Sequence, residues 1–215
     1  MMKYLWTLMF IAILFAACGE DDTPCPDCKT HNWKLDETPY EYKVNIPAHM
    51  GNIQALIPAD NPLTNAKVAL GKKLFYDPLL SRDYTVSCSS CHHPDKAFSD
   101  PRTISLGVED RPGTRNAPAL MNLMFGKSFF WDGNTATLEE QALIPIAADF
   151  EMDNTVEEVI RRINSDTVYQ RMFWEAFGKD PDADGLARAI ASFERILVSF
   201  NSRFDEYIIA EPPIC

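Results

Sequence analysis

Two cysteines and a histidine form the part of the sequence with the clearest chemistry. Cys88 and Cys91 are separated by two residues, and His92 follows directly, which gives the pattern C-x-x-C-H. Two thiols one turn apart can each add to one vinyl group of a porphyrin, while the adjacent imidazole binds the iron. A disulfide or half of a zinc site are the alternatives, but no second Cys/His cluster lies downstream to complete a zinc site. We therefore expect one covalently bound haem c, held by these three residues.

The composition predicts the kind of domain that surrounds this motif. The chain has 215 residues, of which 46% are apolar, and it contains 15 prolines. Helix-forming residues are common and β-branched runs are few, so we expect an all-α c-type cytochrome domain with long loops around the covalently bound haem. The formal charge of −11 argues against binding to nucleic acid, which requires a basic surface. It permits a basic redox partner, although an acidic surface also serves solubility.

The first residues predict export and lipidation. Lys3 precedes an uncharged apolar run that is too short to span a bilayer comfortably and is typical of a signal peptide. The run ends in the sequence FAAC, which resembles a bacterial lipoprotein signal, so we expect cleavage after residues 1–17 and lipid on Cys18. An ordinary signal peptide is the alternative. In both cases the mature chain lies in the periplasm or cell envelope, and lipidation would anchor it to a membrane.

The remaining cysteines and the polar segment after the signal define the domain organisation. Residues 18–52 are polar, acidic and rich in proline, which predicts a flexible tether, and residues 53–215 form the haem domain. Cys25 and Cys28 are followed by lysine rather than histidine, so they are not a second haem site and a small disulfide is expected. Cys215 has no assigned role.

Helix signals around the haem motif set the expected order of elements. A helix is predicted from Pro62, which lies in its first turn, to Asp77. The haem motif begins the next helix, which is short because Pro94 ends it. Residues 99–118 form a long loop rich in Gly, Pro, Asp and Arg. Loops of this length in compact domains often have a function, and this one could cover a face of the haem.

Four further helices are expected in the C-terminal part of the chain. The pattern T-x-x-E at residues 137–140 and again at 155–158 starts helices that run to Ala147 and to about Asn164. A third helix starts at Ser165 or Asp166 and ends at Gly178, and the last starts at Asp184. Apolar residues at steps of four and three predict that this last helix is long and faces the core. They are Leu186, Ile190, Phe193, Leu197, Phe200 and Phe204.

From about residue 61 to residue 207 the chain resembles a known family. The resemblance is to the N-terminal half of the bacterial di-haem cytochrome c peroxidases and the related methylamine-utilisation proteins. Several motifs match in the same order, among them LGKKLFYD before the haem motif and PGTRNAPAL after it. The matching stretches are residues 70–77, 86–92, 112–120, 130–133, 138–142 and 151–152.

The resemblance implies a role for five residues. His92 matches the proximal ligand of the haem where this family reduces peroxide, Glu151 matches a distal glutamate, and Gln141 matches a glutamine beside it. Trp131 matches an indole on the electron path between two haems. Asn116 matches a residue near a calcium ion. The implied partners are hydrogen peroxide and a small electron donor such as cytochrome c or cupredoxin.

The chemistry of peroxide reduction independently suits these residue types. A proton must move from one peroxide oxygen to the other before the O–O bond breaks, and a carboxylate with a suitably shifted pKa, such as that of Glu151, can carry it. The neutral amide of Gln141 can hold peroxide by hydrogen bonds without adding charge. Met121, Met124 and Met152 could in principle bind the iron from the far side, but core packing is the favoured interpretation.

The chain departs from the family pattern in two ways. Many of these enzymes carry a second histidine ligand on the loop after the haem motif; counting along that loop leads to Val108, and no histidine follows His93. We therefore expect an open, five-coordinate or water-bound iron. The family also has a second haem domain, which would begin near Cys215. The sequence leaves three interpretations open: the chain is a truncated product, one half of a two-chain enzyme, or a mono-haem protein. Its partner could be a second haem-bearing chain or a second copy in a homodimer.

Three alternatives to peroxide reduction follow from the same residues. A plain electron-transfer cytochrome would need a closed, six-coordinate iron. A haem-binding remnant would bind the cofactor without an electron source. Oxidation of a protein, as in the methylamine-utilisation relatives, would need a protein substrate.

Overall fold

The computed structural model of the chain describes residues 41–51 and 55–210. All of them belong to one compact unit, residues 33–215. Within the predicted tether, Tyr42 donates a backbone hydrogen bond to the carbonyl oxygen of Leu63 (3.1 Å). The tether and domain boundaries stay predictions. Three predicted features lie outside the described residues: the signal peptide 1–17, the lipidation site Cys18 and the disulfide of Cys25 with Cys28. Cys215 lies outside them as well.

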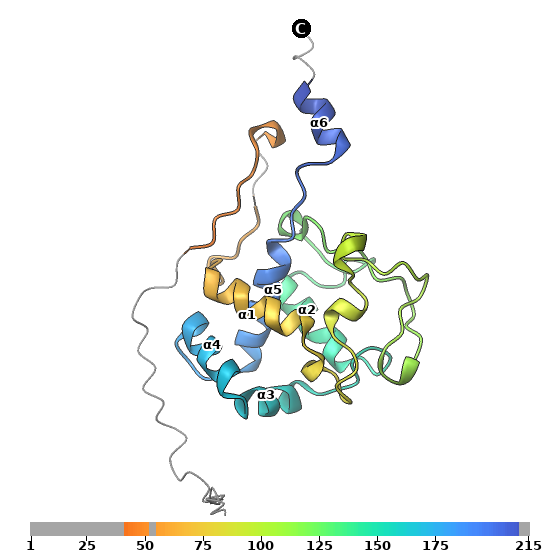
Figure 1. The fold of residues 1–215 in the computed structure, drawn as a ribbon, viewed down its shortest axis with the longest axis vertical. Coiled ribbons are helices and arrows are strands. Elements are labelled where there is room, and N and C mark those ends of the chain that lie inside the picture. The colour runs from red at the N-terminus through yellow and green to blue at the C-terminus, as the bar shows by residue number, and fades with distance from the viewer. Residues whose placement is uncertain (1–40, 52–54, 211–215) are drawn as a thin grey trace, which may run out of the picture. The chain divides into compact units, whose positions relative to one another are not determined.

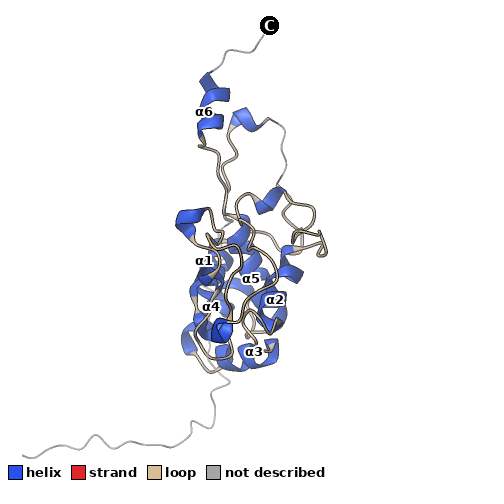
Figure 2. Cartoon of the chain, turned by 90° about the vertical axis from the view of Figure 1, so that its right-hand side faces the viewer, coloured by secondary structure: helices blue, strands red, loops and turns tan. Residues whose placement is uncertain are grey.

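The described residues form helices and loops without strands, which confirms the all-α prediction (Figures 1 and 2). None of the described helices is both long and apolar enough to cross a membrane. The α-helices are α1 (Asn65–Tyr76), α2 (Leu138–Ala147), α3 (Val156–Asn164), α4 (Thr167–Phe177), α5 (Ala183–Arg195) and α6 (Arg203–Ala210). The short 3-10 helices are η1 (Ala48–Met50), η2 (Pro78–Leu80), η3 (Cys88–Ser90), η4 (Pro94–Lys96), η5 (Val108–Asp110) and η6 (Leu123–Phe125).

Side-chain caps start most of the α-helices where the sequence indicates. The hydroxyl of Thr137 accepts the backbone N–H of Glu140, and the hydroxyl of Thr155 accepts that of Glu158, each at 3.1 Å. Asp166 caps α4 in the same manner. The start predicted at Pro62 was wrong, because α1 begins three residues later, where Thr64 caps the N–H of Lys67.

The single long helix predicted from Asp184 to Phe204 was also wrong. α5 ends at Arg195, and the chain is not helical again until α6. The break has a tertiary cause: the N–H of Asn122 donates to the carbonyl oxygen of Leu197 (2.7 Å), and Asn122 Oδ1 accepts the N–H of Ser199 (2.9 Å). These bonds replace the next helical turn, so the apolar stripe leaves the core and Phe204 is 68% exposed.

The core forms where α1 crosses α5 (Figure 1). Gly71 permits the crossing, because a Cβ at this position would lie 1.9 Å from the carbonyl oxygen of Ala189. Side chains from α1, α4 and α5 fill the space around the crossing. Leu70, Leu74, Tyr169, Phe173, Leu186 and Ile190 are each at most 1% exposed.

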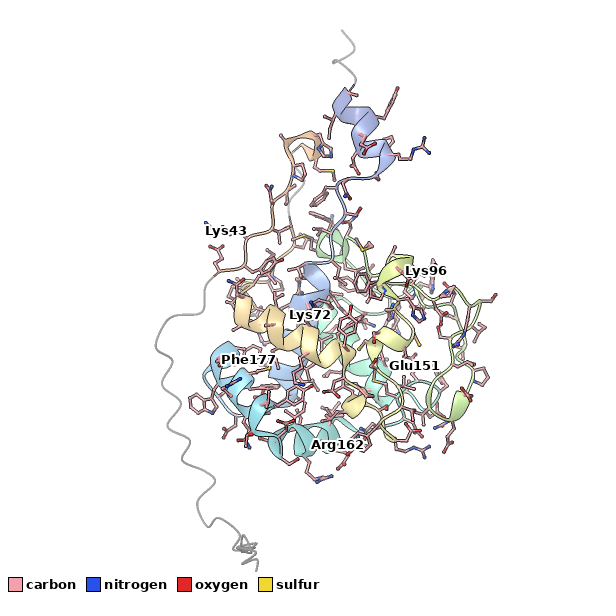
Figure 3. The ribbon with its side chains drawn as sticks, in the orientation of Figure 1. Lys43, Lys72, Lys96, Glu151, Arg162 and Phe177 are labelled. Atoms are coloured by element: carbon pink, nitrogen blue, oxygen red, sulfur yellow. The ribbon has the colours of Figure 1, made fainter. Side chains whose placement is uncertain are left out.

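A buried arginine fixes the turn that leads from α1 to the haem motif. Arg162 on α3 is 9% exposed and donates hydrogen bonds to the carbonyl oxygens of Leu79 (2.9 Å), Ser81 (2.7 Å) and Arg82 (3.0 Å) (Figure 3). Its Nε also donates to Glu158 (2.8 Å). One charged side chain thus donates to three backbone carbonyl oxygens of this turn.

Candidate haem site

The attachment residues lie on one tight turn. The N–H of Cys91 and the N–H of His92 both donate to the carbonyl oxygen of Cys88, at 3.2 and 3.0 Å. A reciprocal pair of hydrogen bonds between Ser87 and Ser90 closes the start of the turn. The two thiols are free rather than joined in a disulfide, and burial raises the pKa of each. Both cysteines are therefore unpaired on the same turn, as attachment to one porphyrin requires.

The ring of His92 is oriented by the backbone. Nδ1 lies 2.8 Å from the carbonyl oxygen of Phe98, which can only accept, so Nδ1 carries the proton and Nε2 is left as the ligating atom. A tight turn brings the carbonyl group of Phe98 close to the His92 ring. In this turn Ala97 (φ 55°) and Phe98 (φ 56°) both have left-handed backbones, and the N–H of Phe98 donates to the backbone carbonyl oxygen of His93. Burial lowers the pKa of His92, which favours the neutral imidazole that a metal needs.

Aromatic side chains surround this motif. The ring centroid of Phe75 lies 6.4 Å from that of His92, 6.0 Å from that of Phe98 and 5.1 Å from that of Phe193. Cys88 packs against the cluster that contains these residues and also against the main core cluster. Two thiols, an oriented neutral imidazole and apolar aromatic side chains are the donors and surroundings of a c-type haem, so the residues present fit this cofactor.

Glu151 is joined to the haem motif by a short loop. At one end of the loop, the sulfur of Cys91 lies 4.0 Å from the carbonyl oxygen of Leu106; at the other, the N–H of Val108 donates to the carbonyl oxygen of Glu151 (2.8 Å). Between them, a Cβ at Gly107 would lie 2.5 Å from that same oxygen. Burial raises the pKa of the Glu151 carboxyl, which makes no hydrogen bond among the described residues.

A cluster of two arginines and two carboxylates holds the turn that carries Glu151. Arg111 hydrogen-bonds Asp153, Arg82 Nε lies 3.2 Å from the same carboxylate, and Arg82 Nη2 donates to Glu109 (2.6 Å). Asp153 (φ 47°) and Glu109 (φ 58°) both have left-handed backbones, which non-glycine residues adopt only when their surroundings enforce it. Sequence reasoning missed this cluster, because no local pattern links residues so far apart.

The other residues predicted for the site lie farther from these contacts. Gln141 is partly exposed on α2, and no hydrogen bond between described residues joins it to Glu151. Trp131 is 65% exposed, and its indole N–H donates to the backbone carbonyl oxygen of Asn116 (2.8 Å). The side-chain amide of Asn116 donates to the backbone carbonyl oxygen of Arg102 (2.7 Å). No cluster of three His, Cys, Asp or Glu residues in the described part of the chain could hold a metal, so the calcium ion stays a prediction.

The loop valine and the methionines belong to the core. Val108, at the position reached by counting to the family's second histidine ligand, is fully buried in the main cluster. Met124 and Met152 are 1% and 3% exposed, and Met121 packs against the aromatic cluster. These positions agree with the packing role expected from the sequence.

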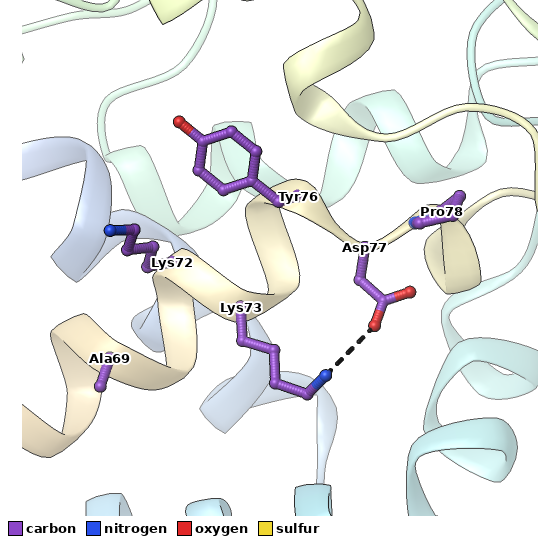
Figure 4. Close-up of a pocket in the computed structure, with 6 residues that line it drawn as sticks. All are labelled: Ala69, Lys72, Lys73, Tyr76, Asp77 and Pro78. Atoms are coloured by element: carbon purple, nitrogen blue, oxygen red, sulfur yellow. Dashed lines mark ion pairs between the residues drawn. The ribbon is translucent and has the colours of Figure 1, made fainter.

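An open hollow of about 570 Å³ lies on the outer side of α1 (Figure 4). It contains the ion pair of Lys73 with Asp77 (3.6 Å) and none of the attachment residues. We therefore do not assign it to the haem chemistry. Its lining residues are Ala69, Lys72, Lys73, Tyr76, Asp77 and Pro78.

Comparison with known proteins places this geometry in context. The family model of the di-haem cytochrome c peroxidases matches residues 65–212. The methylamine utilization protein MauG of Methylorubrum extorquens is 41% identical over 156 residues, which are 72% of this chain and 44% of that protein. The cytochrome c peroxidase Ccp of Escherichia coli is 36% identical over 79% of this chain and 37% of its own length.

Solved structures show the same arrangement. A MauG-like protein associated with microbial copper homeostasis superposes with a TM-score of 0.68 at 33% identity, over 85% of this chain and 52% of that one. The diheme peroxidase BthA of Burkholderia thailandensis superposes with a TM-score of 0.61 at 27% identity, over 68% of this chain and 43% of its own. The chain thus spans about half the length, or less, of the proteins it matches.

Proposed function

Because this chain belongs to the family of the di-haem cytochrome c peroxidases, we propose that it reduces hydrogen peroxide to water at a covalently bound haem c. The electrons would come from a small redox protein such as cytochrome c or cupredoxin. The observation that carries the proposal is the partly buried Glu151 carboxyl, which makes no hydrogen bond among the described residues. Its turn is hydrogen-bonded to the loop that contacts Cys91. The direct test is peroxide-dependent oxidation of reduced cytochrome c by the haem-loaded protein.

The described side chains divide the proposed reaction between them. A haem c held by Cys88, Cys91 and His92 supplies the iron that binds peroxide and exchanges electrons. The hydrogen bond from His92 Nδ1 to the carbonyl oxygen of Phe98 fixes the imidazole and raises its basicity. The Glu151 carboxylate would take the proton from one peroxide oxygen and deliver it to the second, which leaves as water.

Two further residues have proposed roles that rest on the family resemblance. Gln141 holds peroxide by hydrogen bonds, and Trp131 passes electrons toward the site. A calcium ion near Asn116 is part of the same proposal. So are export, the lipid on Cys18 that anchors the chain to a membrane, and a second haem-bearing chain or a homodimer as partner.

The proposal predicts a pH dependence with a defined direction. Glu151 must be ionised to take the first proton, and burial raises its pKa above the usual value for glutamate. Turnover should therefore increase as the pH rises through this raised pKa and be lost as the pH falls below it. The measurement is kcat/KM for peroxide between about pH 4 and 8. A rate that does not change over this range would contradict the assigned role.

Removal of Arg111 tests whether the charged cluster positions Glu151. In Arg111→Ala, Asp153 loses its hydrogen bond and the turn is held on one side only, so we expect kcat to fall about tenfold or more. Arg111→Lys should restore part of the rate. Arg161→Ala is the matched control, because this arginine is 68% exposed and its ion pair among the described residues is with Glu158 on its own helix. Equal rates for Arg111→Ala and the unaltered protein would show that the cluster does not position Glu151.

A second candidate function is the oxidation of a protein partner. The observation in its favour is the indole of Trp131, which is 65% exposed and so could meet a protein that itself supplies the electrons. Relatives named methylamine utilization protein MauG are among the most similar proteins. Peroxide consumption that requires a protein substrate, and does not occur with reduced cytochrome c alone, would favour this candidate.

A further inference from the structure

Glu194 is a buried carboxyl group that the proposed reaction does not use. It lies near the end of α5 and is 4% exposed, and its Oε2 makes no hydrogen bond with any residue that the structure describes. Buried acids without partners are rare, because the ionised form loses its hydration. Burial raises the pKa of Glu194 to about 8. The positive charge of Arg195 lowers this pKa, and the negative charge of Glu139 raises it further.

The neighbouring arginine does not neutralise this carboxyl, because it is already paired. Arg195 donates to both oxygens of Glu139 on α2, at 2.6 and 2.8 Å, and Glu139 also accepts the amide of Asn61 (2.7 Å). Burial opposes ionisation of Glu139, but the hydrogen bonds from Arg195 and Asn61 outweigh it and lower its pKa. Among the described residues, no charged side chain on α1, α3, α4 or η6 shifts the pKa of Glu194.

The remaining ionisable neighbour of Glu194 is a haem-attachment residue. After burial, the charge of Glu194 is the largest influence on the pKa of the Cys88 thiol, ahead of that of Glu151. Cys88 packs against the aromatic cluster that includes Phe193, the residue before Glu194. A haem joined to Cys88 would therefore bring the charge of its iron toward this carboxyl, in a medium that screens charge poorly.

We propose that Glu194 is a redox-linked proton site of the haem. When the iron accepts one electron from a donor, the ionised carboxylate binds one proton from solvent. When the iron gives the electron up, the carboxyl releases the proton, so the summed charge of iron and carboxyl changes little. The proposal rests on covalent haem attachment and not on peroxide reduction.

The test is the midpoint potential of the haem as a function of pH. The holoprotein is titrated with dithionite and soluble mediators between about pH 6 and 9 and followed by its visible spectrum. We expect the potential to fall as the pH rises, by at most 59 mV for each tenfold drop in proton concentration, the value for one electron and one proton. In Glu194→Gln the slope should disappear, whereas in Glu157→Gln, which alters an exposed carboxylate in the first turn of α3, it should persist. Glu194→Met is used if the glutamine variant does not mature.

Two results would overturn the proposal. One is a wild-type potential that does not depend on pH over this range. The other is a Glu194→Gln or Glu194→Met protein that keeps the wild-type slope. A protein that shows the slope but no turnover with peroxide would contradict the proposed function and leave the proton site intact.

Discussion

Replacement of Glu151 by glutamine is expected to lower the peroxide-dependent oxidation of reduced cytochrome c by about 10²- to 10⁴-fold. Glutamine keeps the size and the hydrogen-bonding reach of the side chain but cannot carry a proton between the two peroxide oxygens. Two backbone hydrogen bonds hold the turn: the N–H of Val108 donates to the carbonyl oxygen of Glu151, and the N–H of Arg82 donates to that of Met152. Neither involves the side-chain atoms that the substitution alters. Haem content and the ferric spectrum should therefore stay as in the unaltered protein.

The matched control for this change is Glu157→Gln. Glu157 is exposed in the first turn of α3 and carries the same charge and side chain a few residues away. Its replacement should leave turnover unchanged. If Glu151→Gln retained turnover within about threefold of the control, general acid–base catalysis by this residue would be ruled out.

Replacement of Gly71 by alanine is expected to lower the free energy of unfolding by about 3 kcal/mol. The added Cβ would lie 1.9 Å from the carbonyl oxygen of Ala189 and 2.9 Å from Cβ of Phe193, so α1 and α5 would have to separate. The expected gain in helix propensity, about 1 kcal/mol, is too small to offset this overlap. Urea unfolding followed by circular dichroism measures the change.

Gly113→Ala is the control for this comparison, because the nearest atom to its new Cβ would be a carbonyl oxygen at 3.4 Å, an ordinary contact. It should change stability by less than about 1 kcal/mol. If Gly71→Ala unfolded at the same urea concentration as Gly113→Ala, the close crossing of α1 and α5 would be incorrect.

Local signals were enough to predict most of the helices. Thr137, Thr155 and Asp166 act as caps because their hydroxyl or carboxylate oxygens accept N–H groups a few residues away, a contact visible in sequence. The end of α5 could not be predicted in this way. It depends on Asn122, which lies far earlier in the chain and takes the hydrogen bonds of residues 197–199.

The same distinction applies to the candidate site. Cys88, Cys91 and His92 are adjacent, so their common turn could be predicted from spacing alone. The role of Glu151 was inferred from the family resemblance, but the arginine cluster that holds its turn joins distant parts of the chain and has no local signature. Glu194 carried no signal either, because its burial follows only from the packing of α5.

The ferric visible spectrum of the holoprotein, produced in a host that matures c-type cytochromes, tests the central claim most directly. We predict one haem that stays on the chain under denaturing conditions, together with a mainly high-spin spectrum, because His92 is an oriented ligand and no histidine follows His93. A colourless protein would contradict haem attachment. A coloured protein with a low-spin, bis-histidine spectrum would contradict the open coordination site on which peroxide reduction depends.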